Sequence, residues 1–207
     1  MPELQSIKEL GVQISSCRIC VEEPRGNPLP HEPRPVVRLS TKAKLCIAGQ
    51  APGNRVHQSG IPFTDPSGDR LRDWMGIGED IFYDTDKLAI VPMGFCFPGL
   101  DAKGGDLPPR PECRALWHDA IFKAMPQLEL ILVIGQYAQA YHLGDQREKT
   151  LTATVAKWQS LWNEERSPRV LPLPHPSWRN NGWIRKNPWF TDDLLLVLRA
   201  EVARLTS

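Results

Sequence analysis

The chain has 207 residues and a formal net charge of +1, from 25 Lys and Arg against 24 Asp and Glu. This length suits one α/β domain with a full core, and we expect residues 1–207 to form a single domain. The near-zero net charge excludes a generally basic surface, so any contact with nucleic acid must come from a local patch.

The N-terminal region does not resemble a targeting segment. Residues 1–6 include acidic and polar residues and lack the basic-then-apolar order of a signal peptide. No apolar run approaches the roughly 20 residues of a membrane helix, so we expect no membrane contact. These features predict a cytoplasmic protein, and in that reducing compartment five cysteines indicate thiols or metal ligands rather than disulfides.

The first part of the chain predicts one helix followed by extended chain. Apolar residues spaced along Leu4–Ser15 predict an amphipathic helix that runs into the pair Cys17 and Cys20. Five prolines within Pro24–Pro35 exclude regular structure, so this segment is expected to lie as a strap on the surface. Val36–Leu39 is a candidate short edge strand.

Residues 45–68 form the stretch that points most strongly to a ligand site. Leu45–Ala48 predicts a buried strand, and a helix over Asp69–Met75 should follow with Ser67 as its cap. The Gly/Pro-rich loop between them runs about eighteen residues, and loops of that length are usually functional. At the carboxyl end of a sheet, glycines let backbone N–H groups approach a ligand. The candidate site side chains in this loop are Gln50, His57, Phe63 and Asp65.

Strands and helices alternate through the rest of the chain. Strands are predicted over Leu88–Val91, Leu130–Ile134 and Val170–Leu173, and helices after Pro111, over Tyr137–Leu143, over Leu151–Trp162 behind Thr150, and over Asp192–Leu205 behind Thr191. This alternation predicts an α/β fold, a single three-layer α/β/α domain with a mainly parallel sheet of about four strands and helices on both faces.

Four of the five cysteines are placed to share one site. Cys17 and Cys20 form a C-x-x-C pair, and Cys96 and Cys113 lie in or next to the Gly/Pro-rich loop after the second strand. Four thiolates suit a [4Fe–4S] cluster or a tetrahedral zinc ion, and the spacing does not separate the two. The alternatives are free thiols or a redox pair of Cys17 and Cys20. Cys46 lies in an apolar strand and should be a buried, small apolar residue.

The segment after the last strand combines a histidine with basic and aromatic residues. His175 should lie at the same sheet edge as the Gln50 loop, where an imidazole can donate a hydrogen bond to a leaving group that becomes anionic. Residues 169–190 hold four basic residues and no acidic one, interleaved with aromatic side chains, a mixture that suits a nucleic-acid strand. We expect Trp189 and Phe190 in the core, and at least one of Trp178 and Trp183 exposed.

These motifs together resemble those of the uracil-DNA glycosylase superfamily. Residues 49–53 (GQAPG), 60–63 (GIPF) and 67–68 look like its first motif, and residues 175–177 (HPS) look like its second. The four cysteines resemble the cluster ligands of the iron–sulfur (family 4) branch, and the loop after the first strand has some features similar to family 5. The resemblance spans residues 17–177.

The resemblance implies a monomeric DNA glycosylase that flips a deaminated base, uracil or a related one, out of the duplex and hydrolyses its N-glycosidic bond in base excision repair. The implied catalytic residues are His175, Asp65 and Gln50. The implied base-binding residues are Gly49, Ala51 and Phe63, with Phe63 stacking on the base. The implied DNA contacts are Gly53, Ser67, Gly68, Ser177, Trp178 and Arg179. The implied cluster ligands are Cys17, Cys20, Cys96 and Cys113.

Two positions depart from the iron–sulfur branch. That branch has a glutamate where this chain has Gln50, and Asp65 is the candidate replacement. It also has a uracil-reading asparagine where this chain has Pro92, so the base removed stays open between uracil and another deaminated base. The alternative function is a non-catalytic module, stapled by its metal, that binds single-stranded or damaged DNA through Phe63 and residues 169–190.

Overall fold

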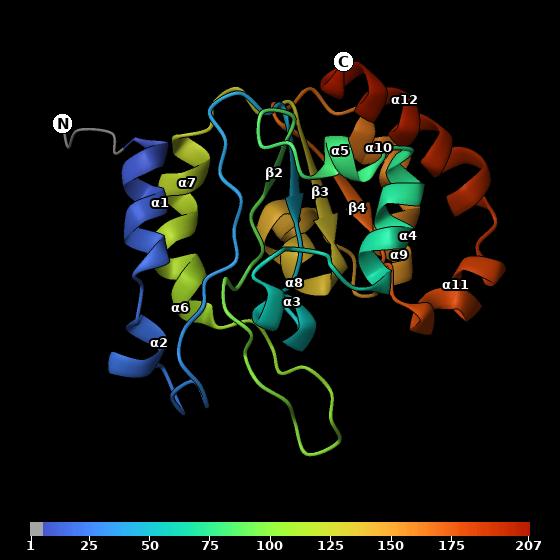
Figure 1. Ribbon diagram of the computed structural model, residues 1–207. Coiled ribbons are helices and arrows are strands. Elements are labelled where there is room, and N and C mark those ends of the chain that lie inside the picture. The colour runs from blue at the N-terminus through green and yellow to red at the C-terminus, as the bar shows by residue number, and fades with distance from the viewer. Residues whose placement is uncertain (1–5) are drawn as a thin grey trace.

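The computed structural model describes residues 6–207, and its regular strands form one four-stranded sheet. The strands are β1 (Leu45–Ala48), β2 (Leu88–Ile90), β3 (Leu130–Ile134) and β4 (Arg169–Leu173). They lie in the order β2-β1-β3-β4, and all neighbouring pairs are parallel. Helices cover both faces of the sheet (Figure 1). The predicted α/β architecture with about four parallel strands is confirmed.

Side chains alternate along each strand between two cores, as the pleat of a sheet requires. In β1, Leu45 and Ile47 point to one core, and Cys46 and Ala48 point to the other. The first core also takes side chains from α4 (Pro66–Met75), α5 (Glu79–Phe82) and α12 (Leu195–Thr206), and the second from α1 (Ile7–Ser15), α7 (Asp119–Lys123) and α8 (Gly135–Leu143). Because both faces are buried, β1 to β3 read in the sequence as continuous apolar runs.

Shorter elements join these layers. They are the helices α2 (Ile19–Glu22), α3 (Asn54–Ser59), α6 (Pro111–Cys113), α9 (Leu151–Ala156), α10 (Trp158–Trp162) and α11 (Asn181–Lys186), the π-helical turns η1 (Arg114–His118) and η4 (Phe190–Leu194), and the 3-10 turns η2 (Gly144–Gln146) and η3 (Trp178–Asn180). α3 lies inside the loop that follows β1, so that loop is not structureless along its length.

The strand predicted at Val36–Leu39 does not form. This segment makes a single antiparallel bridge, between Arg38 and Ile90, beside β2. Pro35 before it has no N–H to give a ladder, and Ser40 after it turns the chain by accepting hydrogen bonds from the N–H groups two and three residues further on. Only one bridge therefore fits between these two interruptions.

Two predicted helix caps are wrong. Asp65, rather than Ser67, caps α4, which begins with Pro66 at its first position. Thr191 lies inside η4, where its hydroxyl donates to the carbonyl of Pro188. The side chain of Phe190 is fully buried as predicted, with Trp189 packed partly buried against the same core.

The other helix predictions are close to the structure. Thr150 caps α9 as predicted, and the single helix expected over Leu151–Trp162 is divided at Lys157 into α9 and α10. Ser6 caps α1 in a reciprocal capping box with Glu9, which places the helix start after the predicted one. Leu4, where that helix was expected to begin, lies outside the described residues.

The strand order creates a switch point between β1 and β3. The chain leaves β1 toward β2 on one side and leaves β3 toward β4 on the other, which opens a crevice at the carboxyl ends of these strands. The loop between β2 and α6 projects beyond the sheet as the long hairpin in Figure 1. Within residues 6–207 we find no helix that is both long and apolar enough to span a membrane.

Candidate active site

A cavity of about 410 Å³ lies at the carboxyl ends of the strands, a size within the range of about 300–1,000 Å³ of small-molecule sites. Among its lining residues are Gly49, Gln50, Ala51, Gly53, Phe63, Asp65 and Ser67 after β1, Pro92 and Asp106 after β2, Ile134 in β3, and His175, Ser177, Trp178 and Arg179 after β4. The two motif loops therefore meet at one cavity. Gly68 and His57 are not among the lining residues; His57 packs against His31, with ring centroids 4.2 Å apart.

Phe63 is held at the cavity wall in a strained backbone conformation. Its φ is +56°, a left-handed conformation that costs a non-glycine residue about 1–2 kcal/mol. The carbonyl oxygen of Phe63 accepts a hydrogen bond from the Tyr83 hydroxyl at 3.3 Å, and its ring packs edge-on against Phe82. A Cβ on Gly49 would lie 3.7 Å from Cζ of Phe63, so the ring reaches over Gly49. Strain of this kind, held by its surroundings, is typical of ligand sites.

The start of α4 fixes Phe63 from behind. A Cβ on Gly68 would overlap the carbonyl oxygen of Phe63, so only glycine fits at this position. The N–H of Gly68 donates to the Oδ1 atom of Asp65 at 3.2 Å, and the N–H of Ser67 donates to the same atom at 3.0 Å. Gly68 is buried and its N–H is paired with Asp65, so the role that this structure gives it is packing against Phe63.

His175 lies two residues beyond the end of β4, and its protonation follows from its contacts. The N–H of Ser177 donates to Nδ1 of His175 at 3.2 Å. Because a backbone N–H can only donate, Nδ1 carries the lone pair and the neutral ring bears its proton on Nε2. Burial lowers the pKa of His175 below its ordinary 6.5, against the opposing effect of Asp65 and Asp106. At pH 7 His175 is therefore neutral, with one N–H to donate.

Asp106 lines the cavity although no sequence motif marks it. It lies on the hairpin between β2 and α6, and its Oδ2 atom is 3.6 Å from the position that a Cβ on Gly53 would take. Asp106 is exposed at the rim of the cavity, and desolvation of its carboxylate raises its pKa, while His175 and Arg179 act in the opposite direction. The sequence feature that could have pointed to Asp106 is its place in the second Gly/Pro-rich loop. Loops at the carboxyl ends of parallel strands share one sheet edge, so this loop was expected beside the cavity.

The loops around the cavity are tied together by the backbone. The carbonyls of Gly49 and Gln50 accept hydrogen bonds from the N–H groups of Met93 and Gly94, both at 2.9 Å, which joins the loop after β1 to the loop after β2. Within residues 6–207 the side-chain amide of Gln50 has no hydrogen-bond partner. This amide is therefore free to meet a ligand.

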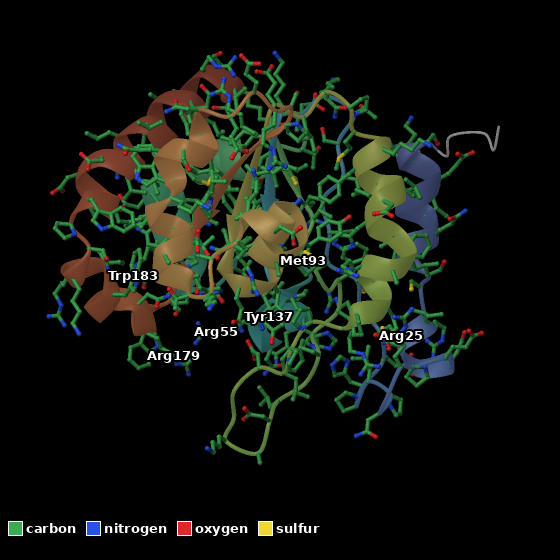
Figure 2. All side chains as sticks on the ribbon, turned by 180° about the vertical axis from the view of Figure 1, so that it is seen from behind. Arg25, Arg55, Met93, Tyr137, Arg179 and Trp183 are labelled. Atoms are coloured by element: carbon green, nitrogen blue, oxygen red, sulfur yellow. The ribbon has the colours of Figure 1, made fainter. Side chains whose placement is uncertain are left out.

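The mouth of the cavity is basic and aromatic. Trp178 is 71% exposed, and the Cζ atom of Arg179 lies 5.6 Å from its ring centroid. Arg55 also lines the cavity, and Figure 2 shows Arg55 and Arg179 at the end of the molecule from which the long hairpin projects. Arg70 in α4 donates from Nη1 to the carbonyl of Ser177 at 3.0 Å, which fixes the loop after β4. The predicted exposure of a tryptophan in this segment is confirmed.

Three of the four cysteines predicted to share a site are linked in pairs. The interaction between the thiols of Cys20 and Cys113 lowers the pKa of Cys20 and raises that of Cys113. Cys20 and Cys96 pack in one small buried cluster with Leu29. Burial raises the pKa of Cys96 to about 12, with smaller electrostatic contributions from Cys20 and Cys17. Cys20, Cys96 and Cys113 are buried, and Cys17 is half-buried.

The cysteines have the sulfur donors that a thiolate metal centre needs, but these donors are not assembled into a metal site in the part of the chain that this structure describes. Across residues 6–207, no group of three or more His, Cys, Asp or Glu side chains is arranged to hold a metal ion. Four cysteine thiols, three of them buried, are nevertheless donors of the chemical type that iron–sulfur and zinc take. The fifth cysteine, Cys46, is fully buried in β1, and burial raises its pKa to about 12, so it is the core residue that was predicted.

The sheet is parallel and doubly wound, and its cavity lies at the switch point. An aromatic ring, a neutral histidine and two carboxylates line this cavity. Together these features define an α/β protein with an enzyme-like ligand site. Residues 37–199 match the model of the uracil DNA glycosylase superfamily. The match covers most of the chain and both motif loops, so the chain belongs to the uracil DNA glycosylase superfamily. This membership supports a DNA glycosylase, a hydrolase of N-glycosidic bonds. Cys17 and Cys20 lie outside the matched range.

A solved structure similar to this chain is that of wild-type SMUG2 from Pedobacter heparinus. The two chains are 14% identical, the alignment covers 77% of this chain and 76% of that chain, and the TM-score is 0.43.

Proposed function

We propose that the protein removes a deaminated base, uracil or a related one, from DNA as a step of base excision repair. The observation that carries this proposal is that Phe63 and His175 line one cavity of about 410 Å³ at the carboxyl edge of the sheet. A flipped base has a π-face to stack on an aromatic ring and an edge for hydrogen bonds. Phe63 provides the stacking surface, and the main chain of Gly49 and Ala51 with the Gln50 amide provides the edge contacts.

The reaction is hydrolysis of the bond between C1′ of the sugar and the base nitrogen. The electron pair of this bond leaves with the base, and the sugar passes through an oxocarbenium-like state. The Nε2–H of neutral His175 donates a hydrogen bond to the developing anion of the leaving base. Asp65 and Gln50, on the same loop as Phe63, are the candidates from the sequence motifs for placing the attacking water.

The mouth of the cavity supplies the contacts to DNA. Trp178 and Arg179 extend into solvent beside the cavity. In the proposed complex they insert into the base stack of the DNA, at the position that the flipped base leaves. Gly53, Ser67 and Ser177 contact the flanking phosphates. We propose that the protein acts as a monomer on one flipped nucleotide.

The test is a cleavage panel with oligonucleotides that hold uracil, hypoxanthine or xanthine opposite each normal base and in single strands. The wild-type protein should release free base from at least one of them, and His175→Ala should abolish release while binding persists. If the wild-type protein binds these oligonucleotides and releases no base from any, the proposal fails and the protein is a non-catalytic DNA-binding module.

We further propose that Cys17, Cys20, Cys96 and Cys113 hold a [4Fe–4S] cluster, as in the iron–sulfur branch of the superfamily. The pairwise interactions of Cys20 with Cys113 and with Cys96, all three of them buried, support this proposal. Such a cluster with four thiolate ligands is structural, joining the segment before the proline-rich strap to the loop after β2.

Metal analysis of protein purified without oxygen tests the cluster. A brown protein with four iron atoms per chain, bleached by dithionite and destabilised by Cys113→Ala, is expected. A colourless protein with one zinc ion per chain would show that the bound metal is zinc rather than an iron–sulfur cluster. A metal-free protein of full stability would exclude both metals.

A further inference from the structure

We propose that Asp106 positions the attacking water and accepts its proton, an inference that rests on the proposed function. The carboxylate comes from the hairpin after β2, rather than from the loop that carries Phe63.

The hairpin holds Asp106 at a defined place. Residues 99–107 fold back on themselves, with a bridge between Leu100 and Asp106 and a hydrogen bond from the N–H of Leu107 to the carbonyl of Gly99 at 3.0 Å. The carboxylate of Asp101 closes the turn by accepting hydrogen bonds from the N–H groups of Lys103 and Gly105 at 2.8 and 2.9 Å. Asp106 therefore enters the cavity wall from an ordered turn, with its Oδ2 beside Gly53.

Two carboxylates line the cavity, and they differ in what they are free to do. Oδ1 of Asp65 is committed to the cap of α4, because it accepts the N–H groups of Ser67 and Gly68. Among the described residues, the carboxylate of Asp106 has no hydrogen-bond or ion-pair partner. Both oxygens of Asp106 are thus available to a water molecule, and Asp65 instead shapes the loop.

The charges around Asp106 suit a base that works beside a neutral histidine. The groups that act on it are His175, Arg179 and Asp65. Asp106 is exposed at the rim of the cavity, and desolvation of its carboxylate raises its pKa, which makes it a better acceptor for a proton of water than an ordinary aspartate. Because His175 keeps its proton on Nε2 for the leaving base, the acceptor for the proton of water has to be a second group.

The step balances without any further reactant. The bond between C1′ and the base nitrogen breaks, and its electron pair leaves with the base, which His175 stabilises by a hydrogen bond. The oxygen of water bonds to C1′, and one proton of that water passes to the carboxylate of Asp106 and from there to solvent. The base anion takes up a proton from solvent, so the products are a free base and an abasic sugar.

The test measures single-turnover base release by Asp106→Asn, with Asp65→Asn as the competing variant and Asp145→Asn as the matched control. Asp145 is an exposed aspartate after α8, outside the cavity lining. Asp106→Asn should slow release at least about 100-fold, the lower limit typical of a lost general base, while its DNA affinity and melting temperature stay at wild-type values. Asp65→Asn should lose less, and Asp145→Asn should match the wild type.

The pH profile gives a readout that a structural role would not move. Ionised Asp106 is the active form, so wild-type release should fall as pH drops through the raised pKa of this carboxyl, and this acid limb should vanish in Asp106→Asn. The inference would be overturned if Asp106→Asn released base at the wild-type rate, or if Asp65→Asn lost more of the release rate than Asp106→Asn. The proposed function would still stand in that case, provided that the wild type releases base and His175→Ala does not. A wild-type protein that releases no base would overturn both.

Discussion

At the scale of single residues, the site depends on a strained aromatic and on the glycine that supports it. Phe63 has a left-handed backbone, and its carbonyl oxygen is enclosed by Tyr83 and by the bare backbone of Gly68. The surroundings thus offset a conformation that the residue alone would avoid. Gly68 contributes to the site by shape, without touching the cavity.

Gly68→Ala should destabilise the fold and weaken base release together. The added Cβ would overlap the carbonyl oxygen of Phe63, and overpacking of this kind costs about 1–3 kcal/mol. Gly11→Ala in α1 is the control, since nothing lies within 4 Å of its Cβ and alanine in a helix interior is favoured by about 0.5–1 kcal/mol. Urea unfolding of both variants checks this, and equal stability of the two would contradict the account.

The residues of the cavity were predictable from sequence to the extent that they follow strands. His175 comes two residues after an apolar run, and Phe63 lies beside Gly and Pro in the long loop after another, which places both at one sheet edge. Asp106 also follows its strand at a distance, but no motif marks it, and only the folded hairpin brings it back to the cavity. The packing role of Gly68 was not predictable, because sequence does not show which atoms a buried glycine lies against.

At the scale of elements, α4 connects the fold to the site. Its cap is Asp65, its first turn supports Phe63, and Arg70 in its second turn holds the loop of His175. The strands, with their long buried apolar runs, were predictable nearly to the residue. Helix starts were less so, because Asp65 and Ser67 are both good caps in sequence and only the backbone geometry at Pro66 decides between them.

Asp65→Ala should lower stability by about 0.5–2 kcal/mol, the usual cost of a lost cap. Asp65→Asn should lose little, because an asparagine oxygen can accept the same N–H groups. Ser67→Ala should leave stability unchanged, since its hydroxyl does not cap the helix. Thermal unfolding followed by circular dichroism measures all three, and a larger loss in Ser67→Ala than in Asp65→Ala would show that the cap is misassigned.

At the scale of the whole molecule, a nearly neutral chain concentrates positive charge at one place. The net charge is +1, whereas Arg55, Arg70 and Arg179 all line the cavity or its mouth. DNA binding should therefore be local, oriented toward the carboxyl edge of the sheet, and sensitive to salt.

Arg179→Ala should weaken binding to DNA of any sequence and lower the slope of log affinity against log salt by about 1, the signature of one lost phosphate contact. Arg199→Ala is the matched control, because Arg199 lies on α12 and donates to the carbonyl of Asp73 outside the cavity. Fluorescence anisotropy titrations at several salt concentrations measure both slopes. The same slope in wild type and Arg179→Ala would place the DNA elsewhere.

The central claim is that one nucleobase enters the cavity between Phe63 and His175 and is cut from its sugar there. The most direct measurement is chromatographic detection of free base and abasic strand after a single turnover with wild type, Phe63→Ala and His175→Ala on one deaminated substrate. We predict release by the wild type and a loss of at least about 100-fold in each variant while all three still bind the oligonucleotide. Release at equal rates by all three proteins would contradict the account.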